Sequence, residues 1–199
     1  MFNKLKNSSR QKKIITLGIA VSVLCLIIAA GIFIDKYAEG VKAEQEGQKL
    51  LAFYNEAADN IKDAKNKPIT YKGFDIIAKL SIEKIGLTLP VISKYDEKAL
   101  GISLCYYQGA MPGQEGNMII TGHNYSSGAH FGKLNKLAIG DEVTLETPDG
   151  KKYTYKVYEI TAVKPDDVTS LYKYNGKKAL TLLTCTSNAN KRLLVRCKM

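Results

Sequence analysis

A stretch near the amino terminus without charged side chains constrains this chain more than any other feature. Residues 14–34 contain no Asp, Glu, Lys or Arg, while residues 1–13 carry five basic residues and no acidic one. A helix that crosses a bilayer needs about 20 apolar residues, whereas the apolar core of a signal peptide usually has about 7–15. The sequence therefore predicts an uncleaved transmembrane anchor at residues 14–34, and a cleavage near Gly31 is the alternative. The basic tail at residues 1–13 predicts a cytoplasmic amino terminus and an extracellular remainder.

The rest of the chain is long enough for a stalk and one folded domain. About 165 residues follow the apolar stretch, too few for two large domains. Residues 35–67 are rich in Ala, Glu, Lys and Gln. Apolar residues recur in this segment at helical spacing, at Leu50, Tyr54, Ala57 and Ile61. We expect a stalk helix whose apolar face either packs on the domain or only holds the domain away from the membrane. Pro68 marks the boundary, so the domain is expected at residues 68–199.

The pattern beyond Pro68 is typical of short strands separated by turns. Strands are expected at residues 76–82, 87–92, 117–121, 143–146 and 153–163, with only brief helical stretches between them. In the last of these strands the apolar residues change from odd to even positions, which predicts a bulge or a strand buried on both faces. The domain is therefore expected to be mainly β, an antiparallel barrel or sandwich.

The cysteines and the charge narrow the classes of function. Four cysteines, Cys25, Cys105, Cys185 and Cys197, match neither a zinc pattern nor a Cys-x-x-Cys redox motif. If Cys185 stays reduced for catalysis, the only disulfide possible outside the span is Cys105 to Cys197, and the sequence does not decide whether it forms.

The net charge of +10 falls to +5 once the basic tail is set aside. The lysines are scattered, so no nucleic-acid-binding stripe is indicated.

Cys185 is the candidate nucleophile, because it ends an apolar run close to the carboxyl terminus and a basic residue follows at Arg192. A cysteine nucleophile reacts as the thiolate, which cationic neighbours favour. The chain has two histidines that could transfer protons, His123 after a buried strand and His130 in a loop. Arg196 competes with Arg192, because residues four apart on a strand point to the same face. A buried structural cysteine is the alternative for Cys185.

Three motifs in order resemble those of the sortase family. They are residues 118–123, which end in Thr-Gly-His, residues 181–185, which read Thr-Leu-Leu-Thr-Cys, and residues 192–195, which read Arg-Leu-Leu-Val. Residues 78–91 are also similar to the opening strands of sortases, so that the resemblance covers about residues 68–199. It implies a single closed antiparallel β-barrel with short helices and a catalytic domain outside a Gram-positive-type membrane.

The resemblance also implies a cysteine transpeptidase. Its substrates are surface proteins with a carboxy-terminal sorting signal of the Leu-Pro-any-Thr-Gly kind, cleaved between Thr and Gly, and the acceptor is a cell-wall peptidoglycan precursor amine. Cys185 would be the nucleophile, His123 the general acid and base, and Arg192 the stabiliser of the oxyanion and substrate. No cofactor is expected. No metal is expected either, because the loop that binds calcium in some sortases offers only Asp96 and Glu97 here.

Subclass and substrate preference are less constrained. The lid motif and second span of pilin-polymerising sortases and the helix inserted in class B are not evident in the sequence, which leaves classes A, D and E, and the compact ending at residues 192–196 favours class D. We expect the loops at residues 93–102, 164–178 and 186–191 to shape the groove, with Asp166 and Asp167 either bordering it or forming a polar turn. The alternatives are a cell-surface cysteine peptidase, a pilin-polymerising sortase and, without catalysis, a membrane-tethered binding module.

Overall fold

The structure, a computed structural model, describes residues 2–61, 68–186 and 189–199. The chain forms two compact units, Met1–Ala38 and Glu39–Met199. Helix α1 (Phe2–Ile61) contributes to both of them. The six residues 62–67 at the end of the expected stalk lie outside the described residues.

The first unit is helical and strongly apolar. Within the described side chains of this unit, the large apolar residues from Ile14 to Ile34 are exposed. Their exposure gives the helix an apolar surface on all sides, and α1 is long and apolar enough to cross a bilayer. An apolar helix of this kind near the amino terminus suggests membrane anchoring.

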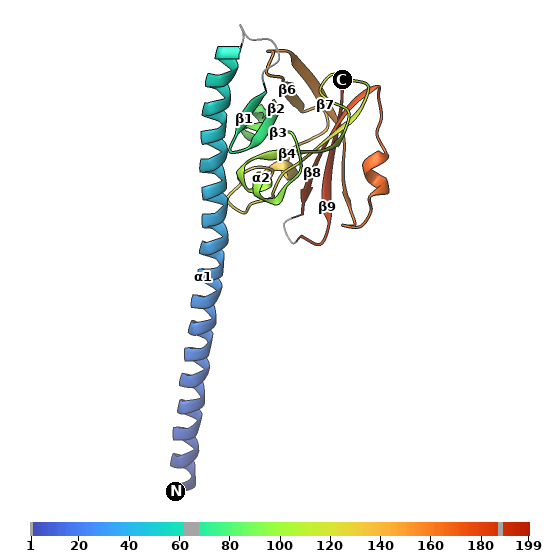
Figure 1. The fold of residues 1–199 in the computed structure, drawn as a ribbon. Coiled ribbons are helices and arrows are strands. Elements are labelled where there is room, and N and C mark those ends of the chain that lie inside the picture. The colour runs from blue at the N-terminus through green and yellow to red at the C-terminus, as the bar shows by residue number, and fades with distance from the viewer. Residues whose placement is uncertain (1, 62–67, 187–188) are drawn as a thin grey trace. The chain divides into compact units, whose positions relative to one another are not determined.

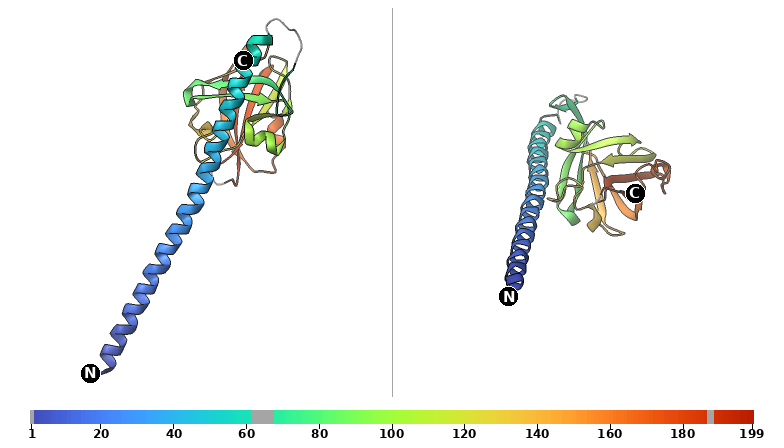
Figure 2. Two further views of the ribbon diagram at one scale, coloured as in Figure 1. Left: turned by 60° about the vertical axis from the view of Figure 1, so that its left-hand side comes forward. Right: turned by 90° about the horizontal axis from the view of Figure 1, so that it is seen from below.

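The second unit is a closed β-barrel (Figure 1). Its eight strands are β2 (Phe74–Ile82), β3 (Leu87–Ile92), β4 (Leu104–Gly109), β5 (Gly116–Thr121), β6 (Glu142–Glu146), β7 (Lys152–Val163), β8 (Lys178–Cys185) and β9 (Arg192–Lys198). They follow the order β2-β3-β4-β5-β8-β9-β7-β6, and pairing of β2 with β6 closes the circle. Strand β1 (Ile69–Tyr71) pairs only with β2, outside the barrel. The expected closed barrel is confirmed, and two further views show its strands curled around one interior (Figure 2).

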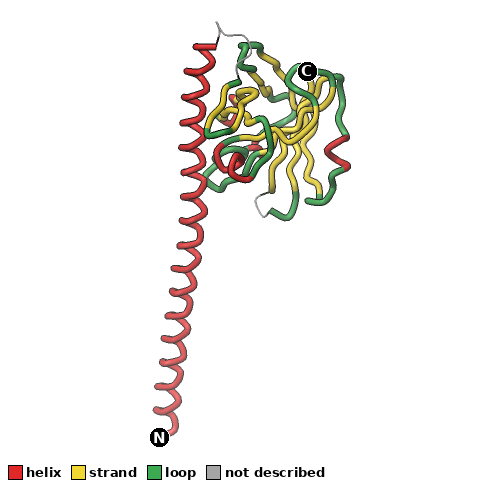
Figure 3. Tube along the Cα trace, in the orientation of Figure 1, coloured by secondary structure: helices red, strands yellow, loops and turns green. Residues whose placement is uncertain are grey.

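The expectation that the barrel is antiparallel needs correction. Strand β3 pairs with β4 in parallel, and β5 pairs with β8 in parallel. A parallel pair needs a crossover connection, and between β5 and β8 the chain makes that crossover through β6 and β7. The other connections are loops and short helices (Figure 3), namely η1 (Glu83–Ile85), α2 (Glu97–Ile102), η2 (Leu134–Lys136) and η3 (Thr169–Tyr172).

The alternation of side chains along the strands places an apolar core inside the barrel. On β2, for example, Ala78, Leu80 and Ile82 are fully buried, while the residues between them are partly exposed. The change of apolar positions in β7 has the predicted cause, a register shift between Val157 and Glu159 opposite β9.

A second cluster of buried residues joins helix α1 to the outside of the barrel. Leu50 and Tyr54 pack with Ile69, Ile76 and other apolar residues that the barrel interior does not use. The expected apolar face of the stalk therefore packs on the domain. This buried face also extends toward the amino terminus through three small residues that lie outside the predicted apolar set, Gly40, Ala43 and Gly47.

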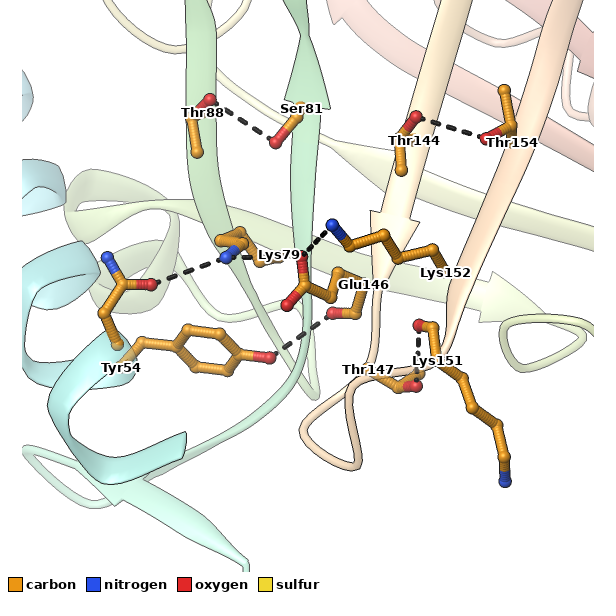
Figure 4. A network of polar contacts seen from close by, with 11 residues as sticks. Tyr54, Lys79, Ser81, Thr88, Thr144, Glu146, Thr147, Lys151, Lys152 and Thr154 are labelled. Carbon is orange, nitrogen blue, oxygen red and sulfur yellow. Dashed lines mark hydrogen bonds and ion pairs between the residues drawn. The ribbon is translucent and has the colours of Figure 1, made fainter. Parts of the chain in front are cut away.

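Tyr54 also reaches the seam that closes the barrel. Its hydroxyl donates to the Glu146 carbonyl oxygen at 3.3 Å (Figure 4). The Glu146 carboxylate forms ion pairs with two lysines: its Oε2 atom lies 3.4 Å from Nζ of Lys79 on β2 and 3.7 Å from Nζ of Lys152 on β7. Because β2 and β6 meet here, α1 contacts the pairing that completes the circle of strands.

We predict that α1 stabilises the barrel through its buried face. Leu50→Ala should lower the free energy of unfolding by about 2–4 kcal/mol, because it removes a fully buried side chain and leaves a cavity. Leu51→Ala is the matched control, because Leu51 is only partly buried, and it should cost about 1 kcal/mol or less. Urea unfolding of the full chain in detergent micelles, followed by tyrosine fluorescence, measures both values. Equal losses for the two variants would contradict this packing.

Candidate active site

The parallel pairing of β5 with β8 brings the ends of the two strands together. Thr121 lies opposite Leu183, and beyond the ladder the Gly122 amide donates to the Leu183 carbonyl oxygen at 3.2 Å. The Thr184 hydroxyl donates back to the Gly122 carbonyl oxygen at 2.7 Å. Glycine at position 122 leaves room for two neighbouring side chains, because a Cβ atom there would come within 2.6 Å of Leu104 and 2.8 Å of Phe131. The segments that carry His123 and Cys185 are thereby fixed side by side.

Arg192 faces Cys185 directly. The two residues are paired across β8 and β9, and the Arg192 Nη1 atom donates to the Cys185 Sγ atom at 2.5 Å. Both side chains are partly exposed. A guanidinium group in this position stabilises negative charge on sulfur or on an oxygen bound nearby.

Arg196 takes a different environment. Its guanidinium is buried, pairs with Glu159 and donates to the Ser170 carbonyl oxygen at 2.7 Å. Strand parity alone left the choice between the two arginines open. Of the two, the structure places Arg192 against the sulfur and directs Arg196 toward η3.

Asn124 is a site residue that sequence reasoning missed. Its Nδ2 atom donates to the Cys185 carbonyl oxygen at 2.7 Å, which ties the loop after His123 to the end of β8. Asn124 also forms an isolated bridge with His130. The signal in the sequence was a carboxamide directly after the candidate histidine, but carboxamides are common in loops and its partner lies 61 residues away.

His123 is half-buried beside Tyr125, with ring centroids 5.1 Å apart. Burial lowers the pKa of His123 from its ordinary value, and the negative charges of Glu97 and Glu39 partly oppose that shift. The Phe131 amide donates to the His123 carbonyl oxygen at 2.9 Å and fixes the backbone. A neutral imidazole can accept a proton and then donate it as the imidazolium, as general acid–base chemistry requires.

His130 is buried in the protein interior, although it lies in the loop between β5 and β6. It is 1% exposed and lies edge-on to Tyr125, with ring centroids 5.2 Å apart. Burial first, and then the neighbouring His123, lower the pKa of His130 to about 4, although the backbones of Ala43 and Ile102 oppose the shift. Neither ring nitrogen has a hydrogen-bond partner of good geometry among the described residues.

A groove of about 350 Å³ connects the candidate residues. His123, Cys185 and Arg192 all line it. Two of the loops expected to shape the groove also contribute, at residues 93–102 and 164–178, and their contributing side chains are Tyr95, Glu97, Leu100, Lys164, Pro165, Asp167, Val168 and Leu171. The third loop, at residues 186–191, includes residues 187–188, which lie outside the described part of the chain. The groove presents an apolar wall and several polar groups to the sulfur atom.

The acidic residues near the groove have local partners. Asp96 caps the amino terminus of α2, where its Oδ1 atom accepts the amides of Lys98 at 2.9 Å and Ala99 at 3.2 Å. Asp167 accepts the hydroxyls of Thr169 and Ser170 at 2.7 and 2.6 Å, and these bonds lower its pKa to about 2. Across the described residues, no group of three or more His, Cys, Asp or Glu side chains could hold a metal ion.

The four cysteines are free thiols. Cys105 and Cys197 are buried in different apolar clusters, so the bridge that the sequence left open is not formed. Burial raises the pKa of each of these two thiols to about 12. Cys185, by contrast, opens onto the groove.

Comparisons with known proteins find matches to one family. A family model described as a Sortase domain matches residues 80–199. Among curated proteins, the chain is 31% identical over 113 residues to sortase A of Bacillus anthracis, which covers 56% of this chain and 53% of that protein. It is 32% identical over 152 residues to sortase SrtE1 of Streptomyces coelicolor, which covers 66% of this chain and 43% of that protein. The chain thus spans about half the length of the curated relatives it matches.

Solved structures include similar folds from more than one sortase class. A Clostridium perfringens sortase D5 transpeptidase is 25% identical, with a TM-score of 0.56, and the match covers 80% of this chain and 97% of that chain. Sortase E1 from Streptomyces coelicolor, solved with a tripeptide in the active site, is 29% identical, with a TM-score of 0.56 and coverage of 62% and 87%. The expected similarity to class D is therefore present, and structures of sortases C and E match equally well by TM-score.

Exposure to the groove predicts which thiol reacts. In a Cys25→Ser background, iodoacetamide at neutral pH should label Cys185 at least about a hundredfold faster than Cys105 and Cys197, because thiolate and access are both needed for alkylation. Peptide mapping by mass spectrometry identifies the labelled residue. Labelling that persists unchanged in Cys185→Ala would show that another thiol is the accessible one.

Burial of His130 predicts a pH-dependent stability. The unfolded pKa of His130 is near 6.5 and the folded value is about 4, so its contribution is present above pH 6.5 and lost as the pH falls toward 4. Relative to His130→Phe, the parent chain should lose about 3 kcal/mol of unfolding free energy between pH 7 and pH 4. Urea unfolding at both pH values measures this difference. Parallel curves for parent and variant would contradict the burial of a neutral ring.

Proposed function

Because the chain belongs to the sortase family, whose members are cysteine transpeptidases, we propose that Cys185, His123 and Arg192 form its catalytic site. Its substrate is a surface protein with a sorting signal of the Leu-Pro-any-Thr-Gly kind. The observation that carries the proposal is the contact of the Arg192 guanidinium with the Cys185 sulfur in a groove that His123 also lines.

In the first step Cys185 gives up its thiol proton, which His123 takes up, and the thiolate attacks the carbonyl carbon of the threonine in the signal. A carbon–sulfur bond forms, and the carbonyl oxygen takes up negative charge, which the Arg192 guanidinium stabilises. His123 then donates a proton to the amide nitrogen of the glycine as the carbon–nitrogen bond breaks. The products are a thioester on Cys185 and a free amine that leaves the groove.

In the second step an amine of a cell-wall peptidoglycan precursor attacks the thioester. His123, now neutral, accepts a proton from the incoming amine, so that a new amide bond forms as the carbon–sulfur bond breaks. Arg192 stabilises the second oxyanion in the same way and the returning thiolate afterwards. Asn124 holds the Cys185 carbonyl, and through it the backbone from which the sulfur projects.

The same proposal assigns a role to each segment of the chain. Residues 1–13 are a cytoplasmic tail, residues 14–34 the membrane span, residues 35–67 the stalk and residues 68–199 the catalytic domain. The catalytic domain faces the outside, where surface proteins and the precursor amine are present. Support comes from the apolar helix near the amino terminus and from the basic residues before it.

Transpeptidation predicts both cleavage and transfer by the full chain in lipid nanodiscs. A quenched peptide containing Leu-Pro-Glu-Thr-Gly should be cleaved, and added triglycine should be joined to its threonine. Cys185→Ala and His123→Ala should abolish turnover, and Arg192→Ala should lower kcat by roughly a hundredfold or more, because an oxyanion donor is lost. Fluorescence reports cleavage, and mass spectrometry reports the transferred product.

Cys197→Ala is the matched control, because it removes a thiol that lies in the barrel core. Cleavage without transfer would favour a cell-surface cysteine peptidase, and transfer to a lysine side chain in preference to triglycine would favour a pilin-polymerising sortase. A chain that binds the peptide equally well with and without Cys185, and never cleaves it, would be a membrane-tethered binding module.

A further inference from the structure

Arg196 is a buried charge that the proposed chemistry does not use. It is 4% exposed, and its Nη1 atom pairs with the Glu159 carboxylate on the neighbouring strand β7. Its Nη2 atom donates to the carbonyl oxygen of Ser170 in η3 at 2.7 Å. The Nε atom has no hydrogen-bond partner in the described part of the chain. The burial of the charge is therefore compensated by the two Nη contacts.

A second buried side chain holds the next carbonyl of the same turn. Asn117 on β5 donates from Nδ2 to the Leu171 carbonyl oxygen at 3.3 Å. Its Oδ1 atom accepts the Thr181 hydroxyl of β8 at 3.0 Å, which fixes the orientation of the carboxamide. Two consecutive carbonyls of η3 are therefore bound by residues from two different strands of the barrel wall.

These contacts determine where the Leu171 side chain lies. It packs with Ile119 and Leu194 on the outer face of the sheet, and Val163 and Leu183 pack against the same cluster. Leu171 lines the groove that contains Cys185 and also a neighbouring hollow of about 440 Å³. Its side chain is consequently part of the wall of both hollows.

We infer that Arg196 and Asn117 are positioning residues that hold η3 so that Leu171 forms the apolar wall of the substrate groove. This inference rests on the proposed function for the identity of the substrate, but the placement of η3 does not. Neither residue lines the groove containing Cys185, in contrast to Arg192. Their effect is on the binding of the peptide, whereas Arg192 acts on the reacting atoms.

Positioning of η3 explains the buried charge of Arg196 better than a contribution to stability alone. A buried ion pair often contributes little net stability compared with apolar residues of the same shape. A guanidinium, however, binds a carboxylate and a carbonyl at once in a fixed plane, which suits it to holding a turn at a set distance from a strand. Lysine carries the same charge without that planar fork.

The test compares Arg196→Gln with Arg196→Lys and Leu171→Ala in the full chain in nanodiscs. Loss of a charge-assisted hydrogen bond should raise KM for the quenched peptide about tenfold in Arg196→Gln and leave kcat within about twofold. Arg196→Lys should recover only part of this loss. Leu171→Ala should raise KM similarly, since it removes the wall and leaves the contacts of the turn intact. Lys156→Gln, which removes an exposed cation on β7, is the matched control.

Amide hydrogen exchange without substrate gives an independent measurement of the turn. The amides of Leu171 and Lys173 donate to the carbonyls of Val168 and Ser170. Both amides should exchange faster in Arg196→Gln and at the parent rate in Leu171→Ala. The amides of β5 and β9 should keep the parent rates in both variants. The rate of Cys185 alkylation should stay within about twofold of the parent in both variants.

Three outcomes would overturn the inference: unchanged exchange in η3, a fall in kcat at constant KM, or a lower Tm with both constants unchanged. A parent chain that cleaves no signal peptide would instead refute the proposed function. In that case the exchange rates of η3 still decide whether Arg196 positions the turn.

Discussion

The parallel hydrogen bonding between β5 and β8 is the constraint on which the rest of the site depends. Six residue pairs hold the two strands in register from Gly116 opposite Lys178 to Thr121 opposite Leu183. Because parallel strands end at the same edge, His123, which follows β5, and Cys185, the last residue of β8, lie at one place. A shift of one residue in this register would turn the sulfur to the inside of the barrel. The barrel therefore supplies the precision that the chemistry needs.

Two arginines on strand β9 differ in burial, and this difference separates the side chain that contacts the sulfur from the one that holds a turn. Arg192 and Arg196 point to the same face of β9, four residues apart. Arg192 is partly exposed and contacts the sulfur, so its charge is available to a reacting group. Arg196 is buried with a carboxylate and a backbone carbonyl, so its charge is already used. The environment, and not the residue type, distinguishes the roles proposed for the two arginines.

The sequence predicted the elements and missed the contacts between distant residues. The apolar face at Leu50 and Tyr54 was visible because helical spacing is local, and the bulge in β7 was visible because strand alternation is local. The parallel pairs were not visible, because strand order is set by long-range packing. The burial of His130 was missed for the same reason, since the helix that contributes to covering it lies about 90 residues away in the chain. Local patterns report elements, whereas sites depend on their assembly.

The most direct test of the central claim is to locate the acyl group on the enzyme. The full chain is mixed with excess signal peptide without an acceptor amine, quenched in acid, and analysed by intact-mass and peptide-mapping mass spectrometry. We expect a mass increase equal to the peptide fragment that ends in threonine, located on Cys185 and released by hydroxylamine. Cleavage of the peptide with no adduct, or an adduct on a different residue, would contradict the account.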